Sequence, residues 1–150
     1  MFCLHALRVK HNPNAAGKLR DHSDGEPMND DGAGEEGWQW PAALDALTAA
    51  PRHHTLLLEN ERVRVLDTRI APGETVPLHT HRWPAVLHIL SWGDFIRRDQ
   101  NRNVTLDTRT LASPPASIVW SAPLPPHTLE NVGTREIRVI TVELKDSPSQ

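Results

Sequence analysis

The stretch Pro72-Gly-Glu-Thr-Val-Pro-Leu-His79-Thr-His81 decides the fold, because two histidines end a run of strand-like residues. Residues i and i+2 of a strand face the same side, so both imidazoles are expected to reach one point. Neutral imidazole is a common ligand of Zn, Fe, Ni and Cu ions, which suits the pair to metal binding. The pair alone is weak evidence. Nine histidines among 150 residues would yield roughly half a His-x-His match by chance.

The sequence on both sides of this stretch has the pattern of a β protein. From residue 54 onward, short apolar or alternating runs are separated by Pro, Gly, Asn and Asp, which predicts a series of strands. Many short strands with no helical pattern between them favour a closed antiparallel barrel or a double sheet. The predicted strands span residues 54–59, 62–71, 76–79, 85–90, 93–98, 103–107, 116–120, 127–132 and 136–144.

The residues before these strands have a different composition. Residues 1–37 mix charges with Gly, Asn, Asp and Pro and contain nothing able to pack a core. Such a segment cannot offset an ordering cost of about 1–2 kcal/mol per residue, so a disordered tail is predicted. A short helix is predicted next, with Pro41 in its first turn and Pro51 at its end, packed on the outside of the barrel. We therefore expect a tail over residues 1–37 and a single domain over residues 38–146.

Length and charge exclude several classes of protein. A chain of 150 residues is the size of one domain, and its net charge of −3 with no basic run argues against a nucleic-acid partner. No stretch approaches the roughly 20 apolar residues of a membrane span, and the opening residues are interrupted by His5 and Arg8. The lone Cys3 cannot form an internal disulfide. We expect a soluble, cytoplasmic protein without a membrane partner.

Further residues extend the His-x-His pattern. Gly73 lies six positions before the first histidine of the pair, Gly93 lies twelve after the second, and His127 precedes Asn131 by four. Together they resemble the two motifs of the cupin superfamily, which are a glycine, five residues, His-x-His, a glutamate and a glycine, and later a histidine followed after three residues by asparagine. The resemblance covers about residues 54–144. It implies an all-β, double-stranded β-helix, the RmlC-like jelly-roll barrel.

The resemblance also implies a metal site inside the barrel. In cupins the matching residues bind a metal, so it assigns His79, His81 and His127 to a divalent ion, with Fe, Zn, Mn, Ni or Cu open. The family's glutamate should fall at position 85 or 86, where this chain has Ala85 and Val86. Three neutral imidazoles would not offset any of the +2 charge of the ion. Such a set is similar to the iron site of the thiol dioxygenase branch, and zinc with three histidines and a water is equally sound.

Three further residues are candidates for the pocket around this site. His88 shares the parity of Val86, so it is expected to point inward if position 86 is the glutamate equivalent, as a fourth ligand, a substrate contact or, most simply, a hydrogen-bonded core residue. Trp83 follows the His-x-His pair and either walls the pocket mouth or only packs. Asn131 is assigned to the pocket with the second motif. No catalytic residue can be named.

Other polar residues of the β region are expected to lie in solvent. His53 and His54 fall outside both motifs, so they are expected to be solvated at the start of the first strand. Arg64 and Arg69 lie on the strand before the first motif, where an inward arginine could bind a carboxylate through two bonds, although outward orientation is the simpler expectation.

Two functions from different classes remain open. The first is a small metal-binding cupin, an oxygenase or isomerase acting on a small polar molecule. The alternative is a non-catalytic cupin with a decayed metal site, which binds a small-molecule ligand or serves as a dimeric structural module. The missing glutamate favours the alternative, whereas the three histidines and Asn131 favour the first. The resemblance further implies a homodimer.

Overall fold

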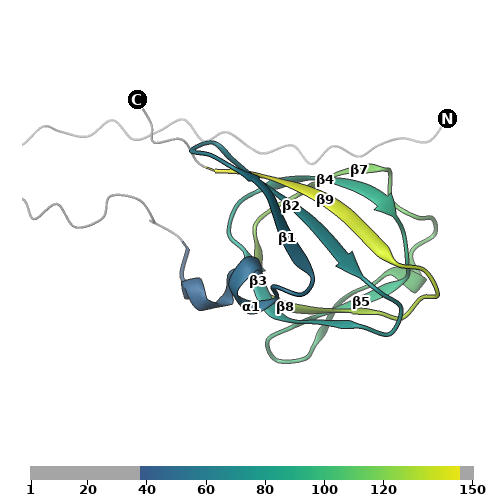
Figure 1. Cartoon of the computed structure of the whole chain (residues 1–150). Helices are drawn as coiled ribbons and strands as arrows, with labels where there is room; N and C mark the ends of the chain where they lie inside the picture. The colour runs from purple at the N-terminus through teal and green to yellow at the C-terminus, as the bar shows by residue number, and fades with distance from the viewer. Residues whose placement is uncertain (1–37, 146–150) are drawn as a thin grey trace, which may run out of the picture. The chain divides into compact units, whose positions relative to one another are not determined.

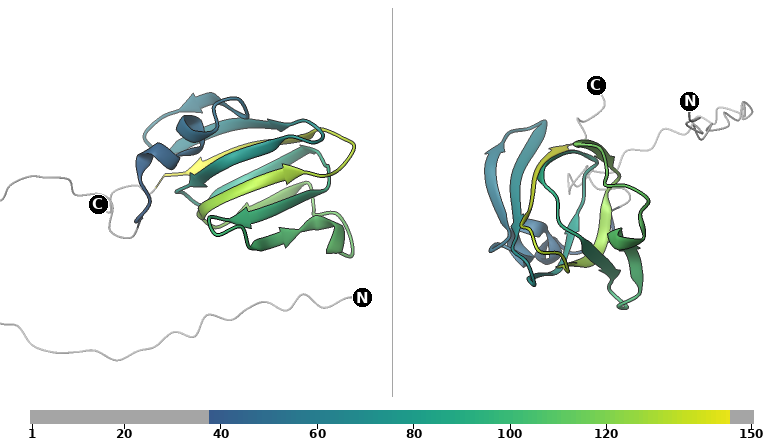
Figure 2. Two further views of the ribbon diagram at one scale, coloured as in Figure 1. Left: turned by 90° about the horizontal axis from the view of Figure 1, so that it is seen from below. Right: turned by 90° about the vertical axis from the view of Figure 1, so that its right-hand side faces the viewer.

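The computed structural model describes residues 38–145, and the predicted tail over residues 1–37 lies outside the described residues. In this part of the chain nine strands form two antiparallel sheets, with orders β1-β2-β9-β4-β7 and β3-β8-β5-β6. The sheets face each other and curve around a common interior (Figures 1 and 2). The strands are β1 (His54–Glu59), β2 (Val63–Ile70), β3 (Thr75–His81), β4 (Ala85–Ser91), β5 (Phe95–Asp99), β6 (Val104–Asp107), β7 (Ile118–Ser121), β8 (Leu124–Asn131) and β9 (Ile137–Leu144).

The all-β prediction is confirmed, and each predicted strand has a counterpart with two notable differences in bounds. β3 continues to His81, so both histidines of the pair belong to the strand. β8 begins at Leu124, three residues before the predicted strand over residues 127–132. Pro125 and Pro126 of β8 are tolerated because β5 pairs with β8 only from His127 onward, which leaves the start of β8 a partner on one side only.

The predicted helix is present as two short turns, a 3-10 turn at Ala42–Leu44 and α1 at Ala46–Ala49. Asp45 separates them, because its backbone is extended and its side chain caps α1 by accepting a hydrogen bond from the Leu47 amide (3.0 Å). α1 packs against β3, and the next residue, Ala50, belongs to the core. None of the helical turns within residues 38–145 has the length and apolarity that a membrane crossing requires.

The apolar core occupies the space between the sheets. Its buried members come from the helix end and from β2, β3 and β9, and partly buried side chains of β5, β8 and β9 pack against them. Burial of such side chains contributes about 25 cal/mol per Å² of apolar surface removed from water. The buried members are Ala50, Ile70, Val76 and Ile137, with Phe95, Leu129 and Val139 beside them.

The two motif glycines are required by the conformation and packing of the backbone. Gly73 has a φ of 80° in the turn closed by the Glu74 amide, which donates to the Ala71 carbonyl (3.0 Å), the geometry of a type II turn. At Gly93 an added Cβ would lie 2.6 Å from the Arg135 carbonyl oxygen. Glycine is thus needed at both positions for chain geometry, and neither glycine touches the site described below.

Candidate metal centre

A cavity of about 430 Å³ lies between the two sheets. Its wall is mostly apolar, and the inward residues of β4 are Ala85, Leu87 and Ile89. The polar groups that reach it include Thr68, Ser121 and several histidines. A concave, mostly apolar site with a few converging polar groups is typical of small-molecule binding.

Four imidazoles gather at this cavity. His79 of β3 and His127 of β8 are cross-strand partners, and their ring centroids lie 4.3 Å apart. The His81 ring lies 5.2 Å from that of His79 and 5.9 Å from that of His127. The His54 ring, from the start of β1, lies 4.9 Å from that of His79 and 5.4 Å from that of His81. We call His54, His79, His81 and His127 the imidazole cluster.

The most compact set of ligand atoms within the cluster differs from the predicted one. His54, His79 and His81 each offer a ring nitrogen, and these nitrogens all lie within 4.8 Å of one another. His127 contacts His79 but is not a member of this set. The structure therefore brings the three predicted histidines into one cluster and adds His54 to it.

Every ring of the imidazole cluster uses its Nδ1 atom in a hydrogen bond. In three rings the partner is a backbone carbonyl, which can only accept, so Nδ1 must carry the proton. The neutral ring then presents the lone pair of Nε2, the atom free to bind a metal. The bonds join Nδ1 of His54 to Ala50 O (3.1 Å), of His79 to Pro77 O (2.7 Å), of His127 to Pro125 O (2.8 Å) and of His81 to Glu143 Oε1 (2.8 Å).

Burial keeps three of these rings neutral, those of His54, His79 and His127. Burial, reinforced by the nearby His81 ring, lowers the pKa of His54 to about 4. Burial likewise lowers the pKa of His127 to about 3, and it lowers the pKa of His79 still further with help from the His127 ring. Neutral rings offer their lone pairs without competition from a proton, as metal binding requires.

A carboxylate lies beside the position where this chain lacks the glutamate of the cupin motif. Ala85 is buried and lines the cavity, so it holds the inward position expected for the glutamate. Its partner on the neighbouring strand β9 is Glu143, whose side chain therefore shares the inward face and is fully buried. Glu143 accepts a hydrogen bond from His81 through Oε1 (2.8 Å) and another from Arg64 through Oε2 (2.5 Å). The carboxylate thus orients an imidazole of the cluster.

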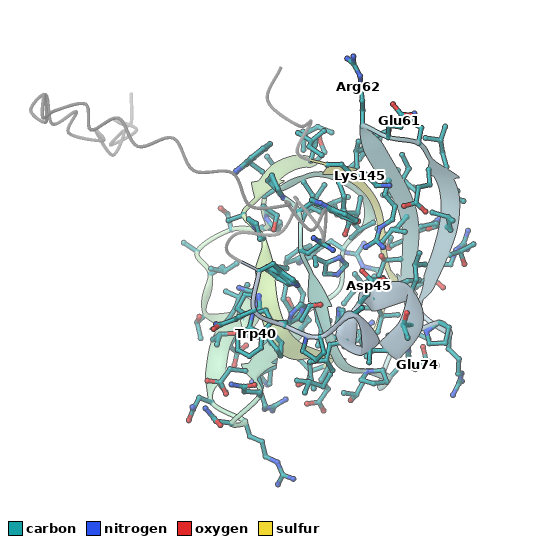
Figure 3. All side chains as sticks on the ribbon, turned by 90° about the vertical axis from the view of Figure 1, so that its left-hand side faces the viewer. Trp40, Asp45, Glu61, Arg62, Glu74 and Lys145 are labelled. Atoms are coloured by element: carbon teal, nitrogen blue, oxygen red, sulfur yellow. The ribbon has the colours of Figure 1, made fainter. Side chains whose placement is uncertain are left out.

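Arg64 completes this buried charge network. It was expected to face solvent, but it is the β2 partner of Glu143 and so faces inward. Its guanidinium also binds both carboxylate oxygens of Asp45 (3.0 and 2.8 Å), which lies at the short helix (Figure 3). Burial would raise the pKa of Glu143, but the hydrogen bonds from His81 and Arg64 outweigh it and lower that pKa overall. Glu143 is therefore ionised inside the protein.

The expected solvation of His53 and His54 is wrong. Their exposed fractions are 7% and 4%. His54 pairs with Thr68 across the β1–β2 hairpin, and Thr68 lines the cavity, so both side chains face it. His53 is covered near Glu74, with its Nε2 atom 3.6 Å from the carboxylate.

Two pocket assignments are also corrected. His88 is exposed, because the inward parity of β4 belongs to Ala85 and not to Val86. Asn131 is fully buried but does not line the cavity. Its side-chain amide donates to the carbonyls of Ile70 (2.9 Å) and Arg135 (2.8 Å), so it holds the turn between β8 and β9. The motif asparagine is a structural residue in this chain.

Trp83 lines the cavity, which was one of the two alternatives left open for it. Cations surround its ring. The Arg64 guanidinium carbon lies 4.8 Å from the ring centroid and the Lys145 ammonium 5.3 Å, within the range of cation–π contacts. The aromatic wall of the cavity is therefore continuous with the charge network that orients His81.

Two residues of the site, His54 and Glu143, were missed by sequence reasoning, although each left a signal. The predicted strands 54–59 and 62–71 form a hairpin, and a turn centred on residue 61 places His54 opposite Thr68. Glu143 has the parity of Thr141, which lines the cavity, so it belongs to the inward side of β9. A polar residue on an apolar strand face was the signal in both cases.

Comparison with known proteins bears on the fold. No protein-family model and no curated protein matches the sequence. A cupin domain from Bordetella pertussis matches in structure with 22% identity and a TM-score of 0.51, covering 62% of this chain and 92% of that one. An RmlC-like cupin with a double-stranded β-helix from Methanocaldococcus jannaschii matches with 15% identity and a TM-score of 0.46, covering 61% and 78%.

A crystal structure described as a predicted oxalate decarboxylase, from Thermotoga maritima, is 19% identical with a TM-score of 0.41, and 62% of this chain and 79% of that one are covered. Identities this low bear on architecture and leave function to the site itself. The two facing antiparallel sheets and the Bordetella match agree with the resemblance carried by the histidine motifs. This chain has the cupin fold, a double-stranded β-helix.

Proposed function

We propose that this chain is a metal-binding cupin, which holds a divalent ion through the Nε2 atoms of His54, His79 and His81 with His127 beside them. The observation that carries the proposal is the hydrogen bond made by every Nδ1 atom of the imidazole cluster. Four rings that only packed together would not need the same nitrogen occupied in each. With the proton on Nδ1, each ring can present its Nε2 atom within one buried cluster.

The residues present fit such an ion. Imidazole nitrogens bound to zinc at 2.0–2.1 Å in a tetrahedron lie about 3.3 Å apart. The set of His54, His79 and His81 lies within 4.8 Å, so small ring rotations would bring these nitrogens together. The contact between His81 and Glu143 also supports the proposal, because metal-bound imidazoles commonly donate their other N–H to a carboxylate.

The surrounding residues define what such a centre does. A divalent ion with neutral ligands supplies Lewis acidity toward an oxygen of a bound molecule. The chain contributes an apolar wall that excludes water. It also contributes the hydroxyl groups of Thr68, Ser121 and Thr141, which can orient a ligand. We infer an enzyme acting on a small molecule by metal-assisted chemistry, with oxygenase and isomerase reactions as the two candidates.

Elemental analysis of protein purified without an affinity tag tests the metal proposal. Close to one divalent ion per chain is expected, and the metal found identifies which of Fe, Zn, Mn, Ni or Cu is bound. The double variant His79→Ala/His81→Ala should lose the ion. The matched control His88→Ala should keep it, because His88 is exposed on the outer face of β4. Wild-type protein that folds without metal, and takes up none on dialysis against these ions, would instead favour the non-catalytic ligand-binding cupin.

A further inference from the structure

Arg97 is a cation of the cavity wall without a counter-charge. It lies on β5 between Leu129 of β8 and Leu106 of β6, and all three residues line the cavity. Its Nε atom donates to the Thr105 hydroxyl (3.3 Å). Within residues 38–145, no carboxylate lies within ion-pairing distance of its guanidinium, whereas the adjacent Arg98 pairs with Glu130 (2.8 Å).

A half-buried cation without a counter-charge lowers the free energy of unfolding, so its presence in the cavity wall points to a function. The Arg97 side chain is half-buried, and burial lowers its pKa with no carboxylate to compensate. The guanidinium nevertheless stays protonated, because its ordinary pKa is above 12. Arg64, which also faces inward, is paired with two carboxylates. Arg97 therefore leaves its terminal N–H donors free for an anion that enters the cavity.

The position of Arg97 relative to the imidazole cluster sets the size of that anion. On β5 the partner of His127 is Asp99, two residues beyond Arg97, so Arg97 and His127 are diagonal neighbours on one face. Diagonal neighbours in a sheet lie about 7–8 Å apart at their Cα atoms. One small molecule can therefore contact the guanidinium at one end and the imidazole cluster at the other.

The wall around Arg97 sets the character of the rest of the ligand. Phe95 lies two residues before it on the same face of β5, and Leu106 and Leu129 flank it on the neighbouring strands. We propose that the cavity binds a small organic acid with an apolar body, whose carboxylate pairs with the Arg97 guanidinium. Planar guanidinium matches a carboxylate in a two-bond geometry, and the apolar walls take up the carbon skeleton. Identifying this acid as the substrate rests on the proposed metal function, whereas its binding by Arg97 does not.

Tryptophan fluorescence provides the readout, because Trp83, Trp92 and Trp120 line the cavity and the chain has no tyrosine. The probes are acetate, hexanoate and phenylacetate, each titrated against its neutral amide, with chelator-treated protein and with metal-loaded protein. Hexanoate and phenylacetate should bind with at least about tenfold higher affinity than their amides, the effect of one charge-assisted pair. Acetate should bind more weakly because it lacks an apolar body.

The variant Arg97→Gln should abolish the preference for acid over amide while leaving amide binding unchanged. Arg98→Gln is the matched control, since the neighbouring arginine pairs with Glu130 outside the cavity, and it should behave as wild type. Should Arg97→Gln fail to fold, Arg97→Lys retains the cation and should keep a reduced preference.

Three results would overturn the proposal. The first is equal binding of acids and amides by the wild type, and the second is no saturable binding of any acid at millimolar concentration. The third is acid binding that requires the metal and survives Arg97→Gln, which would assign the carboxylate to the ion. A protein that binds acids through Arg97 but never takes up metal would retain the anion site and remove only the metal function.

Discussion

The Nδ1 atom of His81 lies 2.8 Å from Oε1 of Glu143, so a carboxylate of β9 orients an imidazole of β3. Glu143 is also the cross-strand partner of Ala85, the residue that stands where the cupin motif places its glutamate. In this chain the carboxylate is therefore contributed by the adjacent strand, and it contacts the His81 imidazole through a hydrogen bond. Such partners fix the ring orientation and raise the basicity of the metal-binding nitrogen.

Removing the negative charge of Glu143 should weaken metal binding. The variant Glu143→Gln can no longer act as an acceptor toward both His81 and Arg64, so we expect a 10- to 100-fold loss of metal affinity. The control is Glu59→Gln. Glu59 is the cross-strand partner of Arg64 on the edge strand β1, but its side chain is partly exposed and forms an ion pair with Lys145. Competition with a chelating dye measures both affinities. Unchanged affinity in Glu143→Gln would show that the carboxylate has no role at the centre.

The ligand set can be resolved by two single variants. His54→Ala should reduce metal affinity more than His127→Ala, because His54 belongs to the compact set of ring nitrogens and His127 does not. Isothermal titration of each variant with zinc gives the comparison. The opposite order would restore His79, His81 and His127, the set implied by the cupin motifs.

Arg64 should be essential for folding stability. Replacement by Met leaves the fully buried Glu143 without its cation, and breaking a buried ion pair in this way costs about 3–5 kcal/mol. Arg69→Met is the control, because the Arg69 side chain is 51% exposed and its contact with Asp67 is worth at most about 1 kcal/mol. Urea unfolding monitored by circular dichroism measures both. A loss for Arg64→Met no larger than that for Arg69→Met would contradict the network.

Asp67 should make part of the stability depend on pH. Hydrogen bonds from Arg138 (3.1 and 3.0 Å), and then from Arg69, hold its pKa below the ordinary value of 3.8 against the opposing effect of burial. The folded protein therefore binds this proton less readily than the unfolded chain, so the stabilisation is complete above about pH 5 and is lost as the pH falls through the folded pKa.

The variant Asp67→Asn should accordingly be less stable than wild type at pH 7, and the difference should shrink at pH 3. Urea unfolding at the two values gives the comparison. A difference that stays constant between them would mean that the Asp67 carboxylate has the same pKa in both states.

Local sequence features predicted the strands and the His-x-His pair because both depend on short-range periodicity. His79 and His81 share a face through the two-residue repeat of a strand, and the type II turn at Gly73 follows from a Pro-Gly dipeptide. His88 was misassigned by one residue of parity, because the motif alone does not fix which of positions 85 and 86 faces inward. A shift of one residue in a strand reverses every side chain.

The charge network depends on contacts that no local pattern encodes. Arg64 and Glu143 are 79 residues apart and meet only because β2 and β9 pair in the final sheet. From the sequence, an arginine in one strand and a glutamate near the end of another both have outward orientation as the simpler expectation. Asp45 joins them through the short helix, whose position is a property of the assembled barrel. The expected homodimer and the cytoplasmic location stay predictions.

The central claim is that the Nε2 atoms of the imidazole cluster converge on one ion, and anomalous diffraction from a crystal grown with zinc tests it most directly. The account predicts a single strong peak inside the barrel, bonded to Nε2 of His54, His79 and His81 at about 2.0–2.1 Å, with His81 still donating Nδ1–H to Glu143. A barrel without a peak, or a peak bonded to Nδ1 atoms or to surface histidines such as His88, would contradict it.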